Sequence, residues 1–156
     1  MRVLSVLVVL GVLLAGLRAE PGEARKKSFK VVSFITAEEV GFDRAGRCVA
    51  KKRVLKAWRM KDYPAKIEHF ESCVTLSSPD KRGRMDFNAS IVATDDTTLL
   101  EVDGRIDLGS QGRVSQQIAW DDLEVLQAGK YFIVLTVDEE EVGRFPIYFE
   151  KTGRGR

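Results

Sequence analysis

Histidine is almost absent from this chain. His69 is the only histidine in 156 residues, so a metal site built from several imidazoles is excluded, and any serine–histidine–aspartate arrangement would have to use this residue. No nucleotide-binding, metal-binding or nucleophile motif accompanies it. We therefore expect His69 to have no catalytic role, and we expect the protein to use no metal and no cofactor.

Long apolar runs are also lacking, except at the start of the chain. Residues 1–19 combine Arg2, a mostly apolar run from Val3 to Leu14, and small residues up to Ala19. A membrane span needs about 20 apolar residues, and this run stops short before Arg18. The pattern is that of a secretory signal peptide cleaved after Ala19. We expect a secreted or periplasmic protein whose mature chain has no transmembrane segment.

The chain has only two cysteines, Cys48 and Cys73. In an oxidising compartment two cysteines pair by default, although the spacing alone leaves two free thiols as an alternative. A bridge across about 25 residues would stabilise the fold by roughly 3 kcal/mol through restriction of the unfolded chain. We expect this disulfide.

No stretch shows the apolar periodicity of an amphipathic helix, whereas alternating apolar and polar residues recur between turn signals. The expected strands cover residues 28–42, 47–61, 67–76, 85–93, 100–108 and 114–120, with a hairpin at 129–150. Residues 47–61 fit a helix in part, but their place between two strands favours a strand. Residues 121–127 are expected to be a crossover, and Asp103-Gly104 a bulge or a turn.

The final hairpin has the clearest pattern. Tyr131, Ile133, Leu135 and Val137 share one face of its first arm. On the second arm the apolar face holds Phe145, Ile147 and Phe149, and the opposite face holds Arg144, Tyr148 and Glu150. A lone hairpin is marginal in water, so the apolar face needs a second sheet to cover it. Seven or eight strands of this kind predict an all-β, antiparallel β-sandwich.

This hairpin, with its Gly129-Lys130-Tyr131 start and acidic tip, resembles the last two strands of immunoglobulin-like domains in secreted bacterial proteins. The resemblance covers about a fifth of the chain and implies a fold, without site residues. From the strand pattern we expect one β-sandwich domain at residues 28–150, after a linker at 20–27 and before a short tail at 151–156.

A basic stretch is the main candidate for binding. Residues 44–66 hold nine lysines and arginines, interleaved with Trp58 and Tyr63. Export from the cytoplasm argues against nucleic acid as the partner, so an acidic protein or an anionic envelope component is expected instead. A solvated edge strand is the plainer explanation. The candidate anionic-partner surface consists of Lys51, Lys52, Arg53, Lys56 and Arg59.

Acidic residues gather at 95–96, 121–122 and 138–141. Converging loops could bind calcium through them, but the chain has no Asp-x-Asp-x-Asp-Gly loop, and solvated turns explain the clusters. Asn88-Ala89-Ser90 matches the N-glycosylation sequon, a short motif that is common by chance.

These observations predict an exported, non-enzymatic binding or accessory module. The alternative is a small-ligand carrier, in which a closed barrel encloses an apolar cavity. A cleft holding His69 with two carboxylates would instead favour an enzyme.

Overall fold

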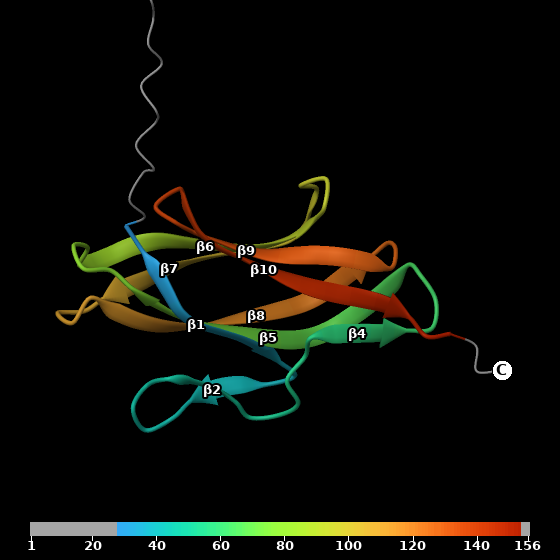
Figure 1. Ribbon diagram of the computed structural model, residues 1–156, viewed down its shortest axis with the longest axis horizontal. Helices are drawn as coiled ribbons and strands as arrows, with labels where there is room; N and C mark the ends of the chain where they lie inside the picture. The colour runs from blue at the N-terminus through green and yellow to red at the C-terminus, as the bar shows by residue number, and fades with distance from the viewer. Residues whose placement is uncertain (1–27, 154–156) are drawn as a thin grey trace, which may run out of the picture.

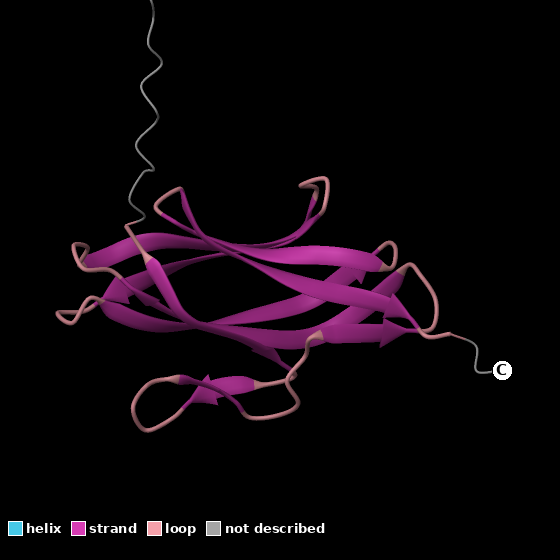
Figure 2. Ribbon diagram, viewed as in Figure 1, coloured by secondary structure: helices cyan, strands magenta, loops and turns pink. Residues whose placement is uncertain are grey.

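A computed structural model describes residues 28–153 of the chain, and all its regular structure is β-strand. Figure 2 shows strands joined by loops in this range. The strands are β1 (Lys30–Ala37), β2 (Val40–Phe42), β3 (Cys48–Ala50), β4 (Ala57–Met60), β5 (Ala65–Ser77), β6 (Gly83–Ala93), β7 (Thr98–Leu108), β8 (Arg113–Val125), β9 (Gly129–Val137) and β10 (Glu140–Lys151). The expected signal peptide at 1–19 and linker at 20–27 lie outside the described residues, as does the end of the tail.

Two sheets form the body of the protein. One has five strands in the order β4-β10-β9-β6-β7, and the other has three in the order β1-β5-β8. Figure 1 shows them as two layers, with the separate β2-β3 pair outside the three-stranded sheet. Neighbours pair antiparallel throughout, except that β4 runs parallel to β10. The all-β prediction is therefore confirmed.

Aromatic side chains from both sheets fill the space between the layers. The Trp58 ring on β4 lies 4.8 Å from Phe70 on β5 and 5.2 Å from Phe149 on β10, measured between ring centroids. Trp120 on β8 stacks on Phe70 at 6.0 Å, and Tyr131 on β9 meets Phe149 edge-on at 5.2 Å. All five are buried. Rings at such distances add attraction beyond the area they bury, so one aromatic cluster joins the two sheets.

The two faces of the final hairpin are assigned correctly by the alternation. Tyr131, Ile133, Leu135 and Val137 are buried on β9, and Ile147 and Phe149 are buried on β10. Phe145 is half-buried and stacks on Phe34 of β1 at 3.9 Å between centroids. Arg144, Tyr148 and Glu150 are exposed on the opposite face.

Residues 28–42 and 47–61 were each expected as one strand, and the structure divides both. The chain leaves β1 after Ala37 and enters β2 at Val40, because Ala37 and Val40 are buried in a small second core while Glu38 and Glu39 turn outward. The second stretch contains β3 and β4 with a loop at 51–56 between them. The strand prediction therefore holds for 48–50 and 57–60, and no part of the stretch is helical.

The expected crossover at 121–127 is wrong, because β8 continues to Val125. Asp122 adopts a left-handed backbone (φ 55°), and beyond it Leu123 and Val125 face the core as Trp120 does. The paired part of β5 shows the same shift in which side chains face the core. Ile67 and Phe70 are both buried there, although alternation placed them on opposite faces.

Asp103-Gly104 is neither a bulge nor a turn. The pair lies inside β7, where Asp103 is opposite Asn88 and Gly104 is opposite Phe87 in regular register.

Truncating a buried residue of the hairpin should cost far more than truncating an exposed one. Leu135 is fully buried, so Leu135→Ala should lower the free energy of unfolding by about 2 to 5 kcal/mol. Tyr148 is 41% exposed, and Tyr148→Ala should change the free energy of unfolding by only about 0.5 kcal/mol. Chemical denaturation of both variants measures the difference, and equal losses would contradict the face assignment.

Candidate functional site

The candidate basic surface occupies one continuous segment. Lys51, Lys52 and Arg53 lie in the loop between β3 and β4, Lys56 immediately precedes β4, and Arg59 lies on β4. All five side chains are exposed. Since β4 is the outermost strand of the five-stranded sheet, the surface borders an open sheet edge.

Three of the five cations meet carboxylates from other parts of the chain. Arg53 Nη2 lies 2.6 Å from Glu38 Oε1, Lys52 Nζ lies 2.8 Å from Glu39 Oε2, and Arg59 Nε lies 3.3 Å from Glu150 Oε2. The hydrogen bond from Lys52 lowers the pKa of Glu39, and the same contact raises the pKa of Lys52.

Lys51 and Lys56 form no ion pair with any residue in the range 28–153. The surface therefore offers two cations without an ion-pair partner in this range, and the five expected from the sequence overstate its attraction for an anion.

A disulfide holds this segment onto the three-stranded sheet. Cys48 of β3 is bonded to Cys73 of β5, with their Cα atoms 5.7 Å apart, which confirms the predicted bridge. Cys73 is fully buried and packs with Ala37 and Val40 beneath the β2-β3 pair. The bond thus lies outside the main core and attaches residues 38–56 to the outer face of β5.

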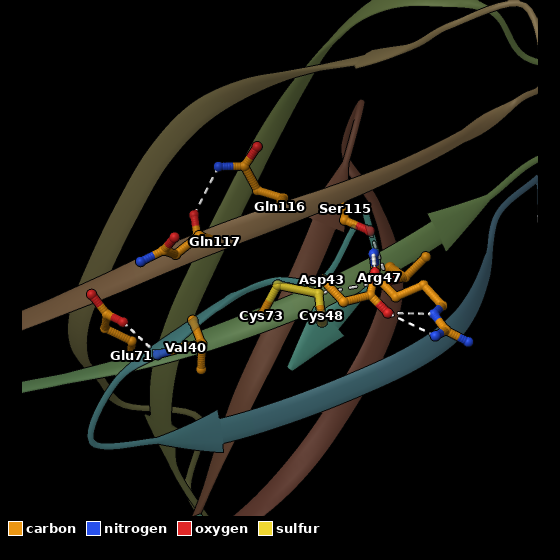
Figure 3. The surroundings of a disulfide bond; sticks show 10 residues. Val40, Asp43, Arg47, Cys48, Glu71, Cys73, Ser115, Gln116 and Gln117 are labelled. Atoms are coloured by element: carbon orange, nitrogen blue, oxygen red, sulfur yellow. Dashed lines mark hydrogen bonds and ion pairs between the residues drawn. A yellow bond between two sulfur atoms is a disulfide. The ribbon is translucent and has the colours of Figure 1, made fainter. Parts of the chain in front are cut away.

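Hydrogen bonds reinforce the attachment, as Figure 3 shows. The backbone N–H of Val40 donates to Glu71 Oε2 on β5 at 2.6 Å. Asp43 accepts from the Arg47 side chain at 2.7 Å, and its pKa is lowered mainly by the backbone N–H of Arg47. The loop that carries Lys51 consequently begins at β3, in a strand pair that is bonded to β5.

A shallow cavity of about 640 Å3 runs beside β4 and is lined by residues 53–60. Its lining includes Lys56 and Arg59, together with Val54, which is 48% exposed. The basic surface is therefore next to a groove where another chain could lie.

His69 lies on the outer face of the three-stranded sheet. Its Nδ1 is 2.6 Å from Asp121 Oδ1 on β8, and its Nε2 is 3.5 Å from Glu71 Oε1. The hydrogen bond with Asp121 raises the pKa of His69 above 6.5. Its side chain is 47% exposed, so these carboxylates orient an imidazole at the surface.

The three acidic clusters do not meet at one place. Asp121 faces His69, and Asp122 pairs with Lys66 across β5 and β8. Asp96 of the β6-β7 turn and Glu141 of β10 both pair with Arg144. Asp138, in contrast, belongs to the lining of a surface hollow. Within residues 28–153, no group of three or more acidic, histidine or cysteine side chains is placed to hold a metal ion.

That hollow, about 1120 Å3 in volume, lies on the outer face of the five-stranded sheet and was not anticipated from the sequence. Asn88 at its centre donates from Nδ2 to Glu101 and, at 2.9 Å, to Asp103. The remaining lining residues are Asp86, Phe87, Gly104, Arg105, Thr136, Asp138 and Glu139. The alternating Glu101 and Asp103 signalled an acidic strand face, but only the pairing of β6 with β7 and β9 brings these residues together.

His69 gives the protein a pH-dependent contribution to stability. A raised folded-state pKa means that the contribution is complete below about pH 6.5 and disappears as the pH rises through the folded-state value. His69→Ala should therefore cost more at pH 5 than at pH 8, by less than about 1 kcal/mol because the contact is partly solvated. Denaturation at the two pH values measures this, and a larger cost at pH 8 would contradict it.

The described residues define an all-β protein with two sheets over one aromatic core. The chain belongs to a family of unknown function (DUF6941), whose model matches residues 32–150. No curated protein matches its sequence. No helix among residues 28–153 is long and apolar enough to cross a membrane.

Solved structures resemble parts of this fold. An alkylpurine DNA glycosylase from Pseudomonas fluorescens, bound to DNA with an abasic site analog, aligns with a TM-score of 0.50 at 10% identity over 79% of this chain and 30% of that protein. A family 2 glycosyl hydrolase from Bacteroides cellulosilyticus aligns at 0.44 with 14% identity, over 55% of this chain and 13% of that one. The chain thus spans under a third of either protein, and the first likeness concerns the fold alone.

Proposed function

We propose that the protein is an exported, non-enzymatic, immunoglobulin-like module that binds an anionic partner. The sheet order supports the immunoglobulin-like assignment. If β1, β5 and β8 are strands A, B and E, then β6, β7, β9 and β10 are C, C′, F and G, and the sheets read ABE and C′CFG. Such a division belongs to sandwiches of this class. In this scheme β4 is a continuation of strand A that crosses to pair with G.

Tyr131 gives further support to this assignment. It is buried near the start of β9, and its hydroxyl donates to the backbone carbonyl of Gln127 at 3.0 Å. A tyrosine at the start of strand F that bonds a few residues upstream is a hallmark of immunoglobulin-like sandwiches. The disulfide differs from the antibody pattern, since it joins β5 to the outer β3 pair and does not cross between the sheets.

Export is supported by the predicted signal peptide together with the Cys48–Cys73 bridge, because disulfides persist in oxidising compartments. We place the protein in the periplasm or outside the cell on these grounds.

The binding role is carried by one observation. Lys51 and Lys56, without a carboxylate partner in the described chain, project from a segment that a disulfide and the Glu71–Val40 hydrogen bond attach to β5. The disulfide holds the backbone of the segment in place, and two cations without a carboxylate partner favour an anionic partner. The acidic partner could be a protein or an anionic envelope component.

A small-ligand carrier is the weaker proposal. A carrier needs an enclosed apolar cavity, and here the aromatic cluster around Phe70 and Trp120 fills the space between the sheets. The 1120 Å3 hollow lies on an outer, acid-lined face. These features favour a surface-binding module over a carrier.

Binding to immobilised heparin, used as a model polyanion, tests the role of the two lysines. The double variant Lys51→Glu with Lys56→Glu should elute at a clearly lower salt concentration than the unaltered protein, because counterion release and screening govern such contacts. The control, Lys30→Glu with Lys81→Glu, makes the same change in net charge at two exposed positions elsewhere. Equal shifts in both double variants would contradict a localised site.

A further inference from the structure

We propose that the five-stranded sheet adds a second copy of this chain edge to edge, with β4 of one copy pairing antiparallel to β7 of the next. It goes beyond the proposed binding role, which uses Lys51 and Lys56, and does not rest on it. The partner is another molecule of the same protein, and it binds by strand addition.

The outer side of β4 presents backbone groups available for pairing. Thr152 donates its backbone N–H to the carbonyl of Met60, so the Met60 backbone faces the β10 side. Successive residues of a strand direct their backbone groups to opposite sides. Ala57 and Arg59 therefore direct theirs toward the open edge, beside the 640 Å3 groove.

The opposite end of the same sheet is also an open edge. β7 pairs with β6 on one side, and no strand within residues 28–153 pairs with its other side. Glu101, Asp103, Arg105 and Asp107 are exposed along its outer face.

The strand directions permit the sheet to continue into a second copy in the same orientation. β4 is parallel to β10, and each following pair in the order β10-β9-β6-β7 is antiparallel. It follows that β4 and β7 run in opposite directions. A copy translated along the sheet therefore presents β4 antiparallel to β7, the arrangement that adds strands most readily.

Charge selects a register for this pairing. Setting Arg59 opposite Asp103 of the other copy also sets Lys61 opposite Glu101 and Ala57 opposite Arg105, so opposite charges meet and no like charges do. The Arg59–Glu150 pair within one copy does not prevent this. Both side chains are mostly exposed, and such pairs contribute little to stability.

The assembly is heterologous, because β4 and β7 are different surfaces. Each copy keeps one free β4 and one free β7, so association forms open chains that grow with concentration. Self-association should be strong at about 0.01 M salt, where the screening length is roughly 30 Å, and weak at about 1 M, where it is roughly 3 Å.

Sedimentation velocity of the purified protein and its variants tests the proposal. The weight-average mass should rise with concentration at low salt. Arg59→Glu and Asp103→Lys should each weaken association roughly tenfold, because each sets like charges opposite one another. Lys81→Glu alters an exposed charge away from both edges and should leave association unchanged. Ala57→Pro removes an outward N–H and should block association without removing a bond of the native sheet.

Mixing the two charge variants gives the sharpest result. The altered β4 of Arg59→Glu complements the altered β7 of Asp103→Lys, and the unaltered β7 and β4 of the same two copies also complement each other, so the mixture should recover the association that each variant alone has lost. A mass of one copy for the unaltered protein at up to about 1 mM and low salt would overturn the proposal, as would a mixture that stays monomeric. Heparin binding through Lys51 and Lys56 could persist in either case, so the proposed function would be tested separately.

Discussion

The contact of Trp58 with Phe70 and Phe149 is the interaction on which the rest of the structure depends. Trp58 lies on β4, yet its ring packs against β5 of the other sheet as well as against β10 of its own. It therefore joins the two sheets and fixes β4 at the sheet edge. The buried ring thus positions β4, which carries Arg59 and borders the groove lined by residues 53–60.

A second, smaller support lies outside this core. The Cys48–Cys73 bond and the buried Ala37 and Val40 hold residues 38–56 against the outer face of β5. Leu55 is the one residue of this segment in the main core, whose other members come from the two large sheets and from residues next to them. The protein thus separates a stable two-sheet body from an attached segment that carries Lys51.

Alternation predicted the strands wherever one face is buried and the other is exposed to solvent, as in β6 and β10. It failed beside Asp122, where a left-handed residue shifts the phase of β8, because no pattern of side chains reports a backbone φ. The basic residues could likewise be found from the sequence. The ion pairs that three of them form could not be predicted. Glu38, Glu39 and Glu150 reach these cations only through the turn after β1 and the parallel pairing of β4 with β10.

Amide hydrogen exchange before and after reduction of the disulfide tests the separation of body and segment most directly. Amides of β6 and β9, at the centre of the five-stranded sheet, should stay protected in both states, while residues 38–54 should lose protection on reduction. A general loss of protection across both sheets on reduction would contradict that separation, because the aromatic core would then not sustain the fold by itself.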